Sequence, residues 1–97
     1  MAQIVENWSD VEGIVREVVS APELPGFVEV SLDVGKAADV EGFRNLLADS
    51  TGTELSLFIP TALADERGVR AGARLVARAR KARPDRAFVD PDYLEVR

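Results

Sequence analysis

The stretch from Thr53 to Arg83 contains two alternating segments, Glu54-Leu55-Ser56-Leu57-Phe58-Ile59 and Ala73-Arg74-Leu75-Val76-Ala77-Arg78-Ala79-Arg80-Lys81. Successive side chains of a strand point to opposite faces of a sheet, so this alternation indicates two half-buried strands. The residues between them, 61–72, are mostly polar and predict a short helical turn. We therefore expect a strand, a short helix and a second strand.

The second alternating segment decides the shape of the expected sheet. Its inward residues would be Ala73, Leu75, Ala77 and Ala79, and its outward residues Arg74, Val76, Arg78 and Arg80. Small inward side chains favour a narrow, strongly curved barrel. A helix over residues 73–83 is the alternative, because alanine and arginine are strong helix formers. Arg74, Arg78 and Lys81 would then share one helix face, but Arg80 and Arg83 would scatter around the helix, and this favours the strand.

Three other segments have the features of strands. Residues 11–19 are rich in β-branched side chains, and Gly13 among them predicts a bulge or bend where one strand serves two neighbours. Residues 87–96 are extended apart from an interruption at Asp90-Pro91-Asp92. Residues 27–34 alternate, and their expected core residues are Val28, Val30, Leu32 and Val34.

The remaining segments predict connectors. Residues 20–26 form a loop by their prolines and glycine, and residues 82–86 form a turn. The long connector 35–52 contains apolar residues at helical spacing, so a short amphipathic helix is expected near residues 40–48. Those residues are Val40, Phe43, Leu46 and Leu47. Leu63 is the expected apolar contact of the helical turn that follows Pro60.

The length of 97 residues predicts one domain. Residues 1–9 are expected to be an arm anchored by Trp8, and residues 10–97 the folded barrel domain. No apolar run approaches the roughly 18 residues that a membrane-spanning helix needs, and the N-terminus lacks the features of a signal peptide. A cytoplasmic location and no membrane partner are therefore expected.

Charge is unevenly distributed along the chain. The net charge is −5, yet eight of the twelve lysines and arginines fall within residues 67–86. Two interpretations remain open. Either the basic strand pairs with acidic neighbours inside the domain, with Arg74 and Arg78 reaching Glu12 and Glu17, or it meets an anionic partner.

Composition restricts the possible chemistry. Cysteine and histidine are both absent, which excludes thiol catalysis, cysteine-ligated zinc and the usual general base at neutral pH. Residues 68–72 lack the lysine and hydroxyl of a phosphate-binding loop. Asp90, Asp92 and Glu95 fit a proline turn with solvated acids better than a metal site. We expect a protein that is not an enzyme and uses no cofactor or metal.

Five strands, a helical turn after the third and a glycine-led entry to the fourth resemble an OB-fold over residues 10–96. The resemblance rests on this order and on Gly13, Pro25-Gly26, Gly52, Val69 and Gly72. The long connector between the second and third strands also suits an SH3-like or other small barrel. The resemblance implies a mostly β, five-stranded barrel with one or two short helices. It also implies that ligands meet strands two and three and the loops 20–26 and 81–86.

That surface predicts a small binding module for single-stranded nucleic acid or another anionic ligand. Outward aromatic rings would stack on bases and cations would follow phosphates. The candidate ligand-binding residues are Phe27, Phe58, Arg78, Arg80, Lys81, Arg83 and Arg86. Glu29 and Asp33 on the same face oppose a polyanion. The alternative is a module for protein interaction or homo-oligomer assembly, in which Phe27 and Phe58 pack in an interface or under the helix near 40–48.

Overall fold

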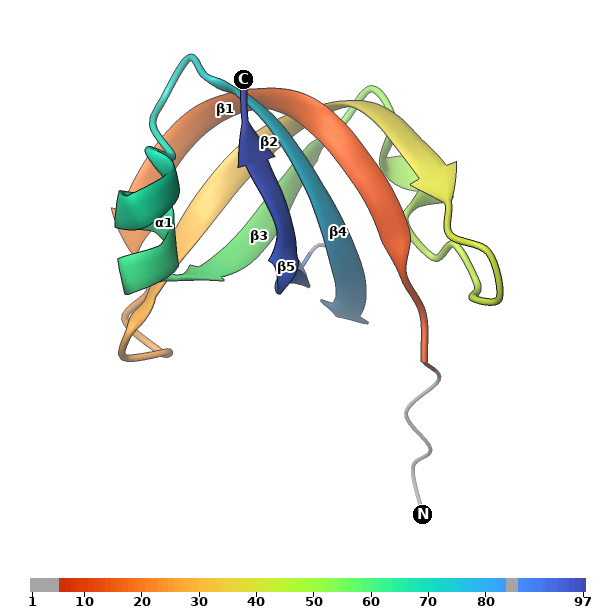
Figure 1. The fold of residues 1–97 in the computed structure, drawn as a ribbon, viewed down its shortest axis with the longest axis horizontal. Coiled ribbons are helices and arrows are strands. Elements are labelled where there is room, and N and C mark those ends of the chain that lie inside the picture. The colour runs from red at the N-terminus through yellow and green to blue at the C-terminus, as the bar shows by residue number, and fades with distance from the viewer. Residues whose placement is uncertain (1–5, 84–85) are drawn as a thin grey trace.

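The computed structural model describes residues 6–83 and 86–97, and Figure 1 shows five long strands curved around a common interior. The expected turn at Pro84 and Asp85 and the first five residues of the expected arm lie outside the described residues. The elements are β1 (Ser9–Ser20), β2 (Phe27–Asp39), the 3-10 turn η1 (Ala48–Ser50), β3 (Glu54–Pro60), α1 (Thr61–Arg67), β4 (Arg74–Arg83) and β5 (Arg86–Val96).

The five strands form a closed barrel in the order β1-β2-β3-β5-β4. β1 pairs with both β2 and β4, which closes the sheet. All pairs are antiparallel except β3 with β5, which run parallel over residues 56–58 and 86–88. The predicted mostly β, five-stranded barrel with short helical elements is confirmed.

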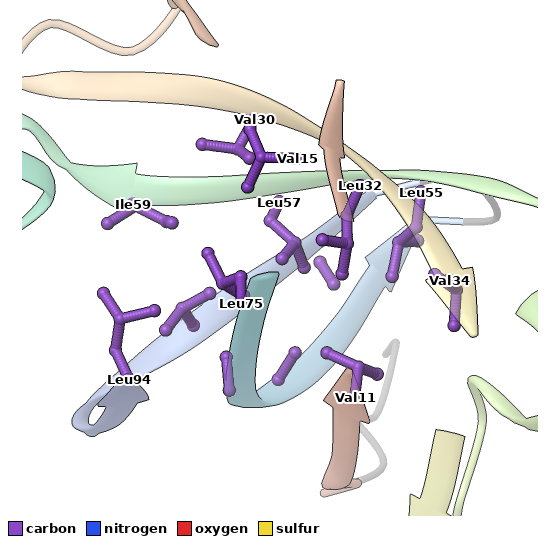
Figure 2. Packing of buried hydrophobic residues seen from close by; sticks show 14 of the residues in the cluster. Val11, Val15, Val30, Leu32, Val34, Leu55, Leu57, Ile59, Leu75 and Leu94 are labelled. Carbon is purple, nitrogen blue, oxygen red and sulfur yellow. The ribbon is translucent and has the colours of Figure 1, made fainter. Parts of the chain in front are cut away.

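Alternating side chains fill the barrel interior as predicted. Figure 2 shows the labelled apolar residues of β1, β2 and β3 converging with Leu75 of β4 and Leu94 of β5. On β4, the small residues Ala77 and Ala79 are buried beside Leu75, so the helix alternative for residues 73–83 is wrong. Small side chains leave room for the bulky residues of the other strands in a narrow interior.

Gly13 lets β1 and β2 approach each other closely. The pairing register shifts between Glu12 and Gly13, which confirms the predicted bulge. A Cβ atom at Gly13 would collide with the backbone carbonyl of Asp33, whose carbon would lie at 2.9 Å. Only glycine fits this crossing, where one strand pairs with both of its neighbours.

The predicted helix near residues 40–48 is wrong. Turns occupy this connector, and Gly42 adopts φ +88°, a left-handed conformation that interrupts a helix. Asn45 fixes the path instead, because its Oδ1 accepts hydrogen bonds from the buried Ser9 hydroxyl and from the backbone N–H of Leu47. Val40 and Leu47 are buried without helical periodicity.

The two ends of the barrel are covered differently. α1 and the connector between β2 and β3 lie at opposite ends of the strands in Figure 1. Leu63 packs on the core as predicted, and Arg67 donates a 2.6 Å hydrogen bond to the Leu94 carbonyl on β5. Among the described residues, no helix has the length and apolar character needed to span a membrane.

The predicted interruption of the last strand is visible as an irregular pairing. β5 is continuous, yet Ala77 of β4 pairs with Leu94 while Ala79 pairs with Val89. The residues between Val89 and Leu94 therefore bulge away from β4. Within this bulge the Asp90 carboxylate accepts a hydrogen bond from the backbone N–H of Asp92.

Candidate functional site

A cavity of about 500 Å³ lies between the β1–β2 loop and the residues where β4 ends and β5 begins. Three of the predicted ligand-binding residues, Phe58, Arg83 and Arg86, contribute to its wall. The complete lining is Glu23, Leu24, Phe58, Ala82, Arg83, Arg86 and Phe88. The two loops expected to flank a ligand surface therefore meet at one site.

Three phenylalanines cluster on the outer face of the barrel beside this cavity. The rings of Phe58 and Phe88 have centroids 5.4 Å apart, and Phe27 meets Phe88 edge-on at 6.2 Å. Phe58 points outward as predicted but is only 1% exposed, so the expectation of an accessible ring is wrong. Its neighbours cover it, whereas Phe27 and Phe88 remain half-buried. Phe27 and Phe58 do not pack under a helix near residues 40–48, because turns occupy that segment.

Phe88 is the central aromatic residue that the sequence-based site did not include. It pairs directly with Phe58 of β3 and with Arg80 of β4, so the three share one row across the outer face. Its flanking residues Ala87 and Val89 are buried in the core. The alternation in this segment was the available signal that Phe88 points outward.

Arg83 and Arg86 form the basic wall of the cavity. They are direct partners across β4 and β5, at the point where β4 ends and β5 begins. Arg86 makes a 3.1 Å ion pair with Glu23, and its guanidinium carbon lies 5.5 Å from the centroid of the Phe58 ring. Arg83 is exposed and has no ion pair with any other described residue. The cavity thus combines an aromatic edge with two cations, of which only Arg86 has an ion pair with another described residue.

Arg78 lies outside the cavity and is held by other groups. Its Nε donates a 2.9 Å hydrogen bond to Asp10, and its guanidinium stacks 4.1 Å from the Tyr93 ring centroid. The hydrogen bond to Asp10 raises the pKa of the Arg78 guanidinium above its usual value. The expected partner Glu17 is wrong for Arg78, because β1 places Asp10 opposite it.

The other basic residues of β4 divide between the two faces. Arg74 pairs with Glu12 at 3.4 Å, as predicted. Arg80 projects outward in the row of Phe88 but does not line the cavity. Lys81 pairs with the core residue Ala87 and donates its backbone N–H to the Asn7 side chain. It does not line the cavity. Most of the predicted basic surface is therefore dispersed.

Two carboxylates border the aromatic cluster. Glu29 lies beside Phe58 in the sheet and accepts a 2.9 Å hydrogen bond from the Ser56 hydroxyl. Glu23 faces the cavity from the β1–β2 loop. Both oppose a ligand with high negative charge, so they limit the affinity of this surface for a polyanion.

No protein-family model matches the sequence, and a search of curated proteins gave no significant match. The residues at the cavity are carboxylates, arginines and apolar side chains. Within residues 6–83 and 86–97, no three acidic side chains lie close enough together to ligate a metal ion. What the arrangement offers chemically is an oxyanion contact beside a flat apolar surface.

Proposed function

We propose that this protein is a small binding module that holds single-stranded nucleic acid, or another phosphate-bearing ligand, at the cavity between the β1–β2 loop and the β4–β5 hairpin. The observation that supports it is the placement of Phe88 beside Arg83 and Arg86. A flat ring and guanidinium donors at one site suit a base and its phosphate.

The barrel topology adds support for the proposed location. The closed five-stranded barrel with a helix between β3 and β4 is consistent with an OB-like barrel. OB-folds bind oligonucleotides and oligosaccharides with the face of strands two and three and with the loops that join strands one to two and four to five. Glu23 and Leu24 of the first loop line the cavity here, together with Arg83 at the end of β4 and Arg86 at the start of β5.

The expected binding is weak and contacts few nucleotides. Stacking contributes roughly 1–3 kcal/mol per base, and of the three clustered phenylalanines only Phe27 and Phe88 are partly exposed. If Arg83 and Arg86 each neutralise one phosphate, the logarithm of the affinity for a single strand should fall with the logarithm of the salt concentration, with a slope of about −1.4. An additional contact from Arg80 would steepen it to about −2.

Fluorescence anisotropy of a labelled twelve-nucleotide oligothymidylate, at low and at moderate salt, tests the proposal. The double variant Arg80→Glu/Arg83→Glu should abolish binding, because it replaces two cations with anions. The fold should survive, because neither arginine has an ion pair among the described residues. The matched control is Arg16→Glu/Arg70→Glu, which changes the net charge equally on exposed residues outside the cavity. Absence of binding by the wild-type protein at tens of micromolar overturns the proposal.

Protein interaction is the second candidate function. Phe43 and Leu46 on the connector between β2 and β3 are 41% and 38% exposed, so this connector presents apolar side chains that do not line the cavity. A partner or a second copy bound there should tolerate the arginine reversal. Sedimentation equilibrium of the wild-type protein and of Phe43→Ser tests this candidate, and a monomer unaffected by concentration argues against self-association.

A further inference from the structure

Glu23 forms an ion pair with Arg86, a cation that a ligand at the cavity would need. Its Oε1 lies 3.1 Å from Nη1 of Arg86, and both residues line the cavity. We propose that Glu23 is an internal competitor, whose carboxylate holds the Arg86 guanidinium until a ligand phosphate displaces it. This inference rests on the proposed function and specifies how the same site is regulated.

The chemistry of the two anions is interchangeable at this position. A guanidinium presents a planar set of N–H groups, which donate hydrogen bonds to carboxylate or phosphate oxygens in the same geometry. Arg86 also lies over the Phe58 ring, which limits the directions from which an oxyanion can approach. The carboxylate of Glu23 therefore marks an oxyanion position beside the aromatic cluster.

Glu23 can leave this position without unfolding the loop. Its side chain is 51% exposed, and ion pairs of such exposure contribute little to stability. The backbone hydrogen bonds of the loop join Leu24 to Ala21, Phe27 to Leu24 and Ala21 to Phe27, and none uses Glu23. Displacement requires a change of side-chain position only.

The neighbouring arginine strengthens the case for exchange. Arg83 and Arg86 are direct cross-strand partners, and like charges in this arrangement repel. Glu23 neutralises only one of them within the described residues. A phosphate group placed between the two cations would compensate both, which a single carboxylate on Arg86 does not do.

Glu23→Gln tests the inference, with Glu12→Gln as its matched control. Each variant removes one negative charge and one exposed ion pair with an arginine, but Glu12 pairs with Arg74 away from the cavity. For the labelled oligothymidylate, Glu23→Gln should tighten binding by about threefold to tenfold, and Glu12→Gln by less than about 1.5-fold. The salt slope of Glu23→Gln should stay at about −1.4, because Arg83 and Arg86 neutralise the same two phosphates in both proteins and only the competing carboxylate is absent.

The double variant Glu23→Gln/Arg86→Gln separates competition from general repulsion. Measured against Arg86→Gln alone, it should show no gain in affinity, because the competed cation is absent. Binding by wild type with no gain in Glu23→Gln, or an equal gain when Arg86 is also replaced, overturns the inference and leaves the proposed function standing. Absence of binding by the wild-type protein overturns the proposed function itself.

Discussion

The backbone of Gly13 passes so close to Asp33 that no other residue fits between β1 and β2 at this point. A Cβ at Gly13 would overlap the Asp33 carbonyl oxygen and lie 3.1 Å from the Cα of Val34. The register shift beside Gly13 places this contact where β1 bends to pair with β4 as well. Closure of the barrel thus depends on a missing side chain.

Gly13→Ala should therefore destabilise the protein by about 1–3 kcal/mol or more, because the clash is with backbone that cannot rotate away. Urea denaturation followed by circular dichroism measures the change. Gly35→Ala is the control, since its Cβ would meet only the Glu12 carbonyl oxygen at an ordinary 3.7 Å. Equal stability of the two variants would contradict the proposed role of the Gly13 crossing.

Leu57→Ala should lower the free energy of unfolding by about 2–5 kcal/mol, because it leaves a cavity in the packed interior. Leu57 is fully buried on β3, and Figure 2 shows it among the other apolar side chains of the barrel interior. Leu46→Ala removes the same atoms from an exposed connector and should cost well under about 1 kcal/mol. Chemical denaturation of both variants gives the comparison, and a small loss for Leu57→Ala would argue against a tightly packed barrel.

Much of this fold was predictable from the alternation of polar and apolar residues, because each strand has one face toward solvent and one toward the core. Gly13 and the inward alanines of β4 were likewise visible in sequence. The connector near residues 40–48 was not, since its path depends on Asn45 bonding to Ser9, 36 residues away in the chain. The spacing of apolar residues within residues 40–48 gives no information on such a tertiary contact.

The site was harder to predict than the fold. Outward direction was correct for Phe58, but its ring is covered by Phe88 and Arg86, which come from β5 and lie about 30 residues further along the chain. Asn7 shows the same limit, since its buried side chain bonds both the N–H and the carbonyl of Lys81. Which cations remain unpaired follows from register, and a single sequence does not specify register between distant strands.

Phe88→Leu should separate folding from binding at the cavity. The leucine retains apolar volume over Phe58, so the variant should lose only on the order of 1 kcal/mol, mostly from the two aromatic contacts. It should lose most stacking affinity for the oligothymidylate. Tyr93→Leu, at a ring 52% exposed and away from the cavity, is the control and should bind normally. Equal binding by both variants would exclude Phe88 as a stacking surface.

Arg78→Ala should cost about 1 kcal/mol, because it removes the ion pair with Asp10 and the stack on Tyr93 at a partly exposed site. Arg80→Ala has no such partners among the described residues and should be silent within about 0.5 kcal/mol. Thermal denaturation at matched salt measures both. For ligand binding, Arg80→Ala should cause the larger loss of affinity of the two, because Arg80 is the cross-strand partner of Phe88.

Titration of nitrogen-15-labelled protein with the oligothymidylate at low salt, followed by amide chemical shifts, tests the proposed binding site most directly. The largest shifts should come from Glu23, Leu24, Arg83, Arg86 and Phe88, which surround the cavity. The amides of residues 40–47 should stay in place. No shift at tens of micromolar ligand, or shifts confined to residues 40–47, would contradict an anion site between the two loops.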